Sequence, residues 1–238
     1  MTDAAIRPRK AELWEKFAED DAYTYIKTDL VDGNLEAFWQ SGETTVREEL
    51  LPLVEEFKIP RECGLEIGCG VGRLVQPLSR FFRQMIGIDI SNGMVRRAQE
   101  SARQRQITNA QFVTVSEPAG LPAALPRGVG KVSFVYSLLV FQHIPDFEVI
   151  ESYIAAISQM LSPDGAAYLQ FDTRAETLPY HLKTALPDFV LPKYLRRGIR
   201  RIRRDPSDIE RIFARYGLKV VAERLPRSVD HRYLLRAS

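Results

Sequence analysis

Short apolar runs alternate with helical patterns between residues 61 and 171. The runs have the length of buried strands, and the helical patterns between them are typical of crossovers that join parallel strands. The alternation therefore predicts a parallel sheet with helices on both faces. Pro77 lies inside the first expected helix and predicts a bend there. The expected strands are residues 64–67, 85–90, 110–115, 132–136 and 167–171, and the expected helices are residues 73–82, 92–106 and 147–161.

The chain continues beyond this core in both directions. Residues 11–57 have apolar side chains at helical spacing, interrupted near Asp32-Gly33 and Ser41-Gly42, which predicts two or three short helices. Residues 206–238 predict a helix and then two consecutive strands, 219–225 and 231–236, that form an antiparallel hairpin at a sheet edge. We expect four units: a helical segment (1–60), the α/β core (61–171), an insertion (172–205) and a helix with a terminal hairpin (206–238).

The composition excludes several classes of protein. The 33 lysines and arginines nearly balance the 31 aspartates and glutamates, so no uniform field draws the chain to nucleic acid or anionic lipid. No apolar run reaches the length of a membrane span, and the N-terminus lacks the apolar stretch of a secretory signal. Cys63 and Cys69 are too few for a disulfide framework. These features predict a globular, cytoplasmic protein.

A glycine-rich segment joins the first expected strand to the first expected helix. Its glycines alternate as Gly68-x-Gly70-x-Gly72. Glycine removes the side chain where the backbone must turn, so a ligand can lie against the main chain and the free N–H groups of the helix N-terminus. A dinucleotide fingerprint requires Gly-x-Gly-x-x-Gly, and Arg73 stands where its third glycine would be. The loop predicts a bound ligand and disfavours NAD.

Two acidic residues accompany this loop. Asp89 lies near the end of the second expected strand, where a carboxylate is placed to accept hydrogen bonds from both hydroxyls of a ribose. Glu66 precedes the glycines, where it would repel a phosphate and suit a ligand with an ammonium group. The two acids favour an adenosine without a pyrophosphate. The alternatives are a tight turn without a ligand, a helix cap for Asp89 and a simple strand-end acid for Glu66.

These residues resemble the motifs of the class I S-adenosylmethionine-dependent methyltransferases. Glu66-x-Gly68-x-Gly70-x-Gly72 is similar to the first motif of that family, and residues 87–91 are similar to the second. The resemblance covers residues 63–171 strongly and the terminal hairpin more weakly. It implies a Rossmann-like fold with a seven-stranded, mostly parallel sheet, whose last strand is antiparallel and inserted beside its neighbour. The other similar segments are residues 112–117, 137–146 and 161–165.

The resemblance also implies a cofactor, S-adenosylmethionine, which leaves as S-adenosylhomocysteine. Asp89 would hold its ribose, Gly68 and Gly70 would lie against its methionine and ribose, and Ile90 and Met94 would pack on its adenine. No metal is expected. The implied cofactor-binding residues are Glu66, Gly68, Gly70, Asp89, Ile90, Met94, Ser116, Glu117 and Ser137.

One position departs from the family pattern. After the third strand the family often has an aspartate that reaches the adenine amino group. This chain has Ser116 there, followed by Glu117, and the sequence leaves open which of them makes the contact.

His143 is the candidate general base. It follows the fourth expected strand, where an acceptor would lie near the transferred methyl group. The ordinary histidine pKa of about 6.5 suits removal of a proton from a hydroxyl or ammonium group. The alternative is a packing or loop-fixing role, because the surrounding His-x-Pro-Asp stretch resembles one found in family members with many different acceptors.

Residues 193–204 hold seven cationic side chains and no acidic one. Leu191, Leu195, Ile199 and Ile202 fall on one helical face, so the segment predicts a basic amphipathic helix. Such a helix would bind RNA phosphates, an anionic acceptor or a membrane surface, or would be the solvated face of an apolar lid. Residues 1–60 and 172–205 are expected to form a lid over the strand ends.

The expected reaction is methyl transfer to an oxygen or nitrogen atom of a small molecule. The chain lacks the Asn/Asp-Pro-Pro-aromatic tetrapeptide of enzymes that methylate planar amino groups, and it has no Pro-Cys nucleophile for cytosine. No carboxylate ends the fourth strand, which disfavours a metal-dependent catechol methyltransferase. The alternatives are an RNA or protein methyltransferase that uses the arginine-rich segment, a non-catalytic cofactor-binding module and a nicotinamide dehydrogenase.

Overall fold

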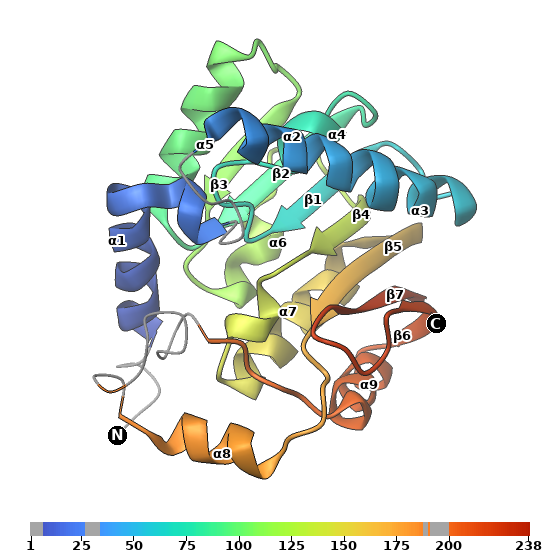
Figure 1. Cartoon of the computed structure of the whole chain (residues 1–238). Coiled ribbons are helices and arrows are strands. Elements are labelled where there is room, and N and C mark those ends of the chain that lie inside the picture. Colours follow the sequence, from blue (N-terminus) through green and yellow to red (C-terminus); the bar gives the residue numbers. More distant parts are fainter. Residues whose placement is uncertain (1–6, 27–33, 188–189, 191–199) are drawn as a thin grey trace.

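The computed structural model describes residues 7–26, 34–187, 190 and 200–238 (Figure 1). Its centre is a seven-stranded sheet in the order β3-β2-β1-β4-β5-β7-β6. The first five strands are parallel, and β7 lies antiparallel between β5 and β6. The predicted Rossmann-like α/β fold with an antiparallel terminal hairpin is confirmed. The strands are β1 (Cys63–Ile67), β2 (Gln84–Asp89), β3 (Ala110–Thr114), β4 (Val132–Ser137), β5 (Leu161–Phe171), β6 (Leu218–Arg224) and β7 (His231–Ala237).

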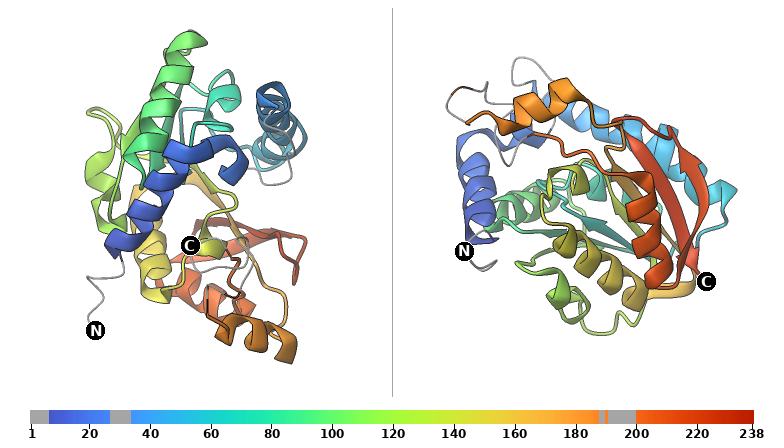
Figure 2. Two further views of the ribbon diagram at one scale, coloured as in Figure 1. Left: turned by 60° about the vertical axis from the view of Figure 1, so that its left-hand side comes forward. Right: turned by 90° about the horizontal axis from the view of Figure 1, so that it is seen from below.

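Helices cover both faces of the sheet (Figure 2). On one face, α3, α4 and α5 pack against strand residues that include Met85 and Phe134. On the opposite face, α7 and α9 pack against residues that include Ile86 and Val135. Neighbouring strand residues are therefore buried on opposite faces, as in parallel sheets with two covered sides. The helical elements are α1 (Arg7–Ile26), α2 (Leu35–Thr45), η2 (Val46–Leu50), α3 (Leu51–Glu56), α4 (Val75–Leu78), α5 (Asn92–Gln104), η3 (Pro118–Gly120), α6 (Leu121–Ala124), η4 (Phe141–His143), α7 (Phe147–Met160), α8 (Leu178–Ala185) and α9 (Pro206–Arg215).

The predicted break at Ser41-Gly42 is wrong. Both residues lie inside α2, which continues through the π-helical turn η2 into α3. Gly42 fits this helix because α2 passes close to the glycine loop, and a side chain at Gly42 would collide with the carbonyl oxygen of Arg73. The other predicted break, at Asp32-Gly33, lies outside the described residues.

The helix after the glycine loop is shorter than predicted. The sequence predicted a bent helix over residues 73–82, whereas α4 spans only Val75–Leu78 between turns. Pro77 has no N–H group to donate to the carbonyl of Arg73, so this helical hydrogen bond is missing. The next one is present, because the Leu78 amide donates to the Leu74 carbonyl at 3.1 Å. The same Arg73 carbonyl is the group that packs against Gly42.

Strand β5 begins earlier than predicted, directly after α7. Its pairing with β4 moves from Val132–Leu161 to Phe134–Ala166, so residues 162–165 bulge out of the strand. These four residues, Ser-Pro-Asp-Gly, are of types that favour turns. They interrupt the strand instead of preceding it.

The insertion contains a helix, α8, that the sequence analysis missed. Pro179 is its second residue, a position in the first turn that needs no N–H donor. Residues 191–199 of the predicted basic helix lie outside the described residues. Residues 200–205 are described and are not helical, so that part of the prediction is wrong. There the Ile202 amide donates to the Gln142 carbonyl at 2.7 Å and the Arg204 amide to the Asp172 carbonyl at 2.9 Å, beside the end of β5.

Helix α1 packs against the N-terminal end of α5. Gly93 of α5 has no space for a side chain, because Glu15 and Ala18 of α1 lie against it. Trp14 and Phe17 of the same helix line the cavity described below. Within the described ranges, none of the helices has both the length and the apolar character that crossing a membrane requires.

Candidate active site

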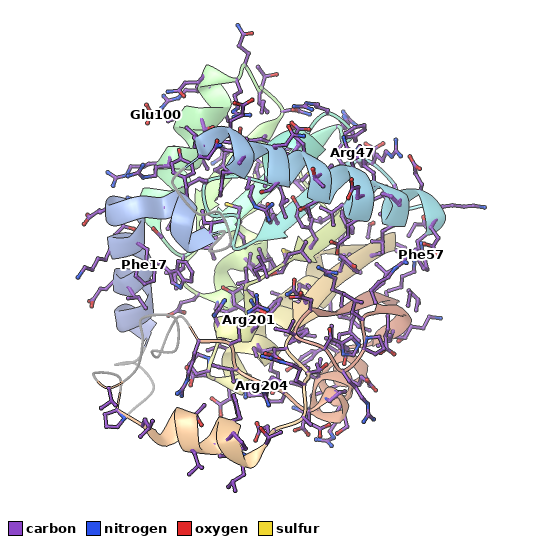
Figure 3. All side chains as sticks on the ribbon, in the orientation of Figure 1. Phe17, Arg47, Phe57, Glu100, Arg201 and Arg204 are labelled. Atoms are coloured by element: carbon purple, nitrogen blue, oxygen red, sulfur yellow. The ribbon has the colours of Figure 1, made fainter. Side chains whose placement is uncertain are left out.

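A cavity of about 630 Å³ lies at the carboxyl ends of the parallel strands. Its walls come from the loops after β1, β2 and β4, from α1, from α8 and the residues before it, and from the residues before α9. Sheets of this topology bind ligands at this edge, and the volume suits a small molecule. Phe17 on α1 and Arg201 before α9, which Figure 3 labels, are both lining residues.

The glycine loop forms one wall of the cavity from bare backbone. The amides of Gly68 and Cys69 both donate to the carbonyl of Ile88, at 2.8 and 2.9 Å, which folds the loop toward β2. Gly68 has a φ of +74°, and a side chain there would collide with Val140. A ligand can therefore approach the main chain closely at this point.

Asp89, the last residue of β2, is tied to the glycine loop. Its Oδ2 accepts a hydrogen bond from the Gly70 amide at 2.8 Å, and its Oδ1 accepts one from the Ser91 amide at 2.9 Å. Burial raises the pKa of this carboxyl, and the hydrogen bonds from the backbone oppose that rise. The cap of α5 is Ser91, whose Oγ accepts from the Met94 amide at 3.1 Å. Each carboxylate oxygen keeps a lone pair for a ligand hydroxyl.

Glu66 and Arg73 are buried charged side chains that line the same part of the cavity. Glu66 is 4% exposed and accepts a hydrogen bond from the Tyr136 hydroxyl at 3.2 Å. Burial raises the pKa of Glu66 to about 8, although the Arg73 charge acts in the opposite direction. Arg73 donates to the Ser41 hydroxyl at 3.3 Å, and its buried Nε has no hydrogen-bond partner among the described residues. An acid and a guanidinium with an unmet N–H fit a ligand that carries both an ammonium and a carboxylate group.

The part of the cavity wall next to Asp89 is apolar. Ile90, Met94 and Val115 line the cavity there, and Trp14 and Phe17 of α1 complete this wall. The Trp14 and Phe17 rings meet edge to face with 5.5 Å between centroids. Such a wall suits a planar, weakly polar ring.

Glu15 binds α1 to the start of α5, beside this apolar wall. Its Oε2 accepts hydrogen bonds from the Ser91 hydroxyl at 2.7 Å and from the Gly93 amide at 2.9 Å. The hydrogen bond from Gly93 lowers the pKa of Glu15. A carboxylate at the N-terminus of α5 is also favoured by the helix dipole. The Glu15 carboxylate therefore joins α1 to the first turn of α5.

His143 lines the cavity beyond the glycine loop. Its Nδ1 lies 3.3 Å from the Arg200 carbonyl, and its Nε2 lies 3.2 Å from the Gln142 amide nitrogen. A carbonyl can only accept, so Nδ1 carries the proton and Nε2 accepts from Gln142. The Gln142 oxygen accepts from Gln170 at 3.4 Å, which agrees with this orientation of the amide. With the amide in this orientation, the lone pair of the ring is on Nε2.

The two ends of the cavity differ in their charged side chains, because Arg73 lies with two carboxyl groups at one end and further arginines line the other. We call them the glycine-loop end and the arginine end. The carboxylates of the cavity lie at the glycine-loop end and are Glu66 and Asp89. The arginine end, which includes His143, is lined by Arg174, Arg200, Arg201 and Arg203.

Most residues predicted to form the site meet in this cavity. The residues that do so are Glu66, Gly68, Gly70, Asp89, Ile90, Met94 and His143. Ser137 does not line it, because its hydroxyl donates to the Ile67 carbonyl at 2.9 Å and ties β4 to β1. Ser116 and Glu117 are exposed after β3 and are not lining residues, whereas the preceding Val115 is. Contact of these three residues with a cofactor stays a prediction.

The sequence analysis missed part of the lining. Trp14 and Phe17 belong to a helical pattern that looks the same for a core helix as for a cavity wall. Arg73 was noticed only as a mismatch to the dinucleotide fingerprint, although its charge opposite Glu66 was a usable signal. Arg174 carried no local signal. In the described part of the chain, no three His, Cys, Asp or Glu side chains are grouped as metal ligands would be.

A family model described as a methyltransferase domain matches residues 38–223. The chain belongs to this methyltransferase family. The predicted membership of the class I S-adenosylmethionine-dependent methyltransferases is confirmed. This family uses S-adenosylmethionine as its methyl donor.

Curated relatives of this methyltransferase include ubiquinone biosynthesis O-methyltransferases. The protein from Brucella anthropi is 27% identical over 159 residues, which are 66% of this chain and 60% of that protein. The protein from Albidiferax ferrireducens is 32% identical over 101 residues, which are 42% of this chain and 37% of that protein. The chain thus spans about 60% or less of the length of these relatives.

Solved structures share the fold of the whole described chain. Magnesium protoporphyrin IX methyltransferase (ChlM) from Synechocystis with bound SAH has a TM-score of 0.66 at 22% identity, covering 95% of this chain and 99% of that one. The DhpI–SAH complex has a TM-score of 0.63 at 14% identity, covering 100% of this chain and 99% of that one. At these identities the likeness establishes the fold of this methyltransferase.

Proposed function

We propose that this protein is an S-adenosylmethionine-dependent methyltransferase that transfers the methyl group to an oxygen or nitrogen atom of a small molecule. The proposal rests on one observation, that the glycine loop, Glu66 and Asp89 line the same cavity. The other end of this cavity is lined by polar side chains, where an acceptor would bind. The names of the curated relatives support an oxygen acceptor. The cavity volume of about 630 Å³ supports a small acceptor beside the cofactor.

The cavity fits the parts of the cofactor in order along its wall. Asp89 would accept hydrogen bonds from the ribose hydroxyls with the lone pairs that Gly70 and Ser91 leave over. Glu66 would bind the ammonium group, and Arg73 would bind the carboxylate through N–H groups that include its unpartnered Nε. The apolar wall beside Asp89 would hold the adenine.

S-adenosylmethionine supplies a methyl group on a sulfonium that is already a good leaving group. The protein then has to align the acceptor with that methyl group and exclude water, which requires few catalytic side chains. Residues of α8 and of the segment before it close the cavity on the acceptor side. His143 presents a neutral Nε2 lone pair, which would take the proton of a hydroxyl acceptor once the Gln142 amide turns away.

Labelled S-adenosylmethionine incubated with the protein and a metabolite extract tests this proposal. We expect a labelled small-molecule product that is lost in Asp89→Ala and kept in Asp164→Ala, which removes an exposed carboxylate in the bulge of β5. A protein that binds S-adenosylhomocysteine but labels nothing would be a non-catalytic cofactor-binding module. Label in a macromolecular fraction alone would contradict a small-molecule acceptor.

The proposed location is the cytoplasm. Cys63 and Cys69 are both buried and unpaired, which supports a reducing compartment. Fractionation of cells that express the tagged protein tests this location.

A further inference from the structure

Four arginines from two chain segments line the arginine end of the cavity. Arg174 follows β5, and the other three precede α9. The segments are held together by a backbone bridge between Asp172 and Arg203 and by the Arg204 amide, which donates to the Asp172 carbonyl at 2.9 Å. The four arginines Arg174, Arg200, Arg201 and Arg203 therefore line one cavity from two segments that are bound to each other.

Among the described residues, carboxylates pair with two of these four arginines. The fully buried Asp172 accepts from Arg174 through Nε at 3.0 Å and Nη2 at 2.6 Å. Asp230 accepts from Arg201 at 3.2 Å and also from Gln170 at 2.8 Å. Of the nearby acids, Glu176 is paired with His181 and does not line the cavity.

Arg200 and Arg203 have neutral partners instead. Arg200 Nη1 donates to the Thr184 carbonyl at 3.1 Å, and Arg203 Nη1 donates to the Ala175 carbonyl. The Arg203 guanidinium lies 4.5 Å from the centroid of the Tyr180 ring, and its buried Nε has no hydrogen-bond partner among the described residues. A buried N–H of a cation that lacks an acceptor costs free energy until an acceptor arrives.

We propose that Arg200 and Arg203 form an oxyanion subsite that binds a carboxylate or phosphate group carried by the small-molecule acceptor. This inference rests on the proposed function and names the class of its substrate. Guanidinium groups bind planar and tetrahedral oxyanions through paired N–H donors. The Arg200 carbonyl is also the partner of His143 Nδ1 at 3.3 Å, so the subsite is joined directly to the candidate base. An acceptor bound by its anionic group would thus place a nearby hydroxyl or amine at His143.

The cavity favours a small anion over a nucleic acid. The arginines line a cavity of about 630 Å³ whose walls also include α1 and α8, which is a small space for a nucleic acid. A polyanion would require a run of exposed cations along its backbone. The described cavity has Glu66, Asp89 and Arg73 at one end and arginines without a carboxylate partner at the other, which fits one cofactor and one anionic acceptor.

The test is calorimetry on the full chain saturated with S-adenosylhomocysteine, with benzoate, phenyl phosphate and the neutral amide benzamide as probes. We expect an anion to bind at least about tenfold more tightly than benzamide. Arg200→Gln should weaken anion binding at least about tenfold, and Arg200→Lys should weaken it less. The affinity for S-adenosylhomocysteine should not change in either variant. Preference for benzoate or for phenyl phosphate distinguishes a carboxylate from a phosphate.

The control is Arg83→Gln, which removes an exposed guanidinium that pairs with Glu62 outside the cavity and should leave every affinity unchanged. Equal binding of anions and benzamide, no binding of either anion, or unchanged anion binding in Arg200→Gln would overturn the proposal. Tighter binding of a single-stranded RNA than of both anions, lost in the same variant, would also overturn it. If S-adenosylhomocysteine does not bind the wild-type chain, the proposed function fails, and the anion titrations on the free protein still decide about the subsite.

Discussion

The wall of the cavity at the glycine-loop end includes bare backbone and two carboxyl groups, whereas at the arginine end it includes arginines that donate to carboxylates or to backbone carbonyls. The first end is built from the ends of two adjacent strands, β1 and β2, and the loops that follow them. The second end needs residues that follow β5 and residues that precede α9, joined by the bridge between Asp172 and Arg203. A ligand shared by a whole family can be bound by a short local motif, whereas the proposed acceptor subsite is built from segments that only the fold brings together.

Replacing Gly68 by alanine should give the largest change at the glycine-loop end. The new side chain would have a positive φ and would collide with Val140, effects worth about 1–3 kcal/mol each. Because the loop must shift, we expect about 100-fold weaker binding of S-adenosylhomocysteine in calorimetry, together with a lower melting temperature. Gly120→Ala is the matched control, since its added side chain meets no atom within 4 Å. Equal affinity in both variants would show that the loop does not touch the ligand.

His143→Gln tests the opposite end. If His143 is the base for a hydroxyl acceptor, turnover measured with labelled cofactor should fall about 100-fold while the affinity for S-adenosylhomocysteine stays the same. The rate of the variant should also lose the rise with pH that deprotonation of a histidine produces. A histidine that only fixes the loop would instead lower both the melting temperature and the cofactor affinity, with the pH profile unchanged.

The Glu66 carboxyl should make the free protein sensitive to pH. Its pKa is about 8 in the fold against 4.5 for an ordinary glutamate, so between these values the folded chain holds a proton that the unfolded chain has lost. Stability should therefore fall as pH rises through this window, by up to roughly 1 kcal/mol per pH unit. Glu66→Gln removes this decline and should be the more stable protein at the upper end of the window, in denaturant titrations at several pH values.

The same variant separates stability from binding. An ammonium group prefers the ionised form of Glu66, so the affinity of the wild type for S-adenosylhomocysteine should rise with pH across the window. In Glu66→Gln that rise should be absent, and the affinity should be about tenfold lower. Glu62→Gln, an exposed acid before β1, should change neither property. A wild-type stability that is flat across the window would contradict a buried, protonated Glu66.

The smallest effect is expected at Glu15, which fastens α1 over the apolar wall. Glu15→Gln keeps an acceptor but loses the charge that favours the first turn of α5, so we expect about threefold weaker cofactor binding and faster release. Glu12→Gln, on an exposed position of the same helix, is the control. Identical release rates in the two variants, measured by stopped flow, would show that α1 does not retain the cofactor.

The glycine-loop end could be predicted because its signals are local. Gly68, Asp89 and Glu66 stand at strand ends that the apolar runs already indicated, and parallel strands bring such ends to one edge. The lengths of α4 and β5 could not be predicted, because they depend on how Pro77 and the 162–165 bulge meet neighbouring elements. The arginine end could not be predicted either. The sequence analysis predicted a helix for the arginine-rich segment, whereas residues 200–205 are not helical and lie beside the end of β5.

The central claim is that one cavity holds an adenosine-bearing sulfonium ligand against the glycine loop and Asp89. Isothermal titration of the chain with S-adenosylmethionine, S-adenosylhomocysteine and NAD tests it most directly. We predict one binding site per chain for each of the first two, lost in Asp89→Ala, and no heat with NAD. Absence of heat with both sulfur ligands, or binding of NAD in their place, would contradict the account.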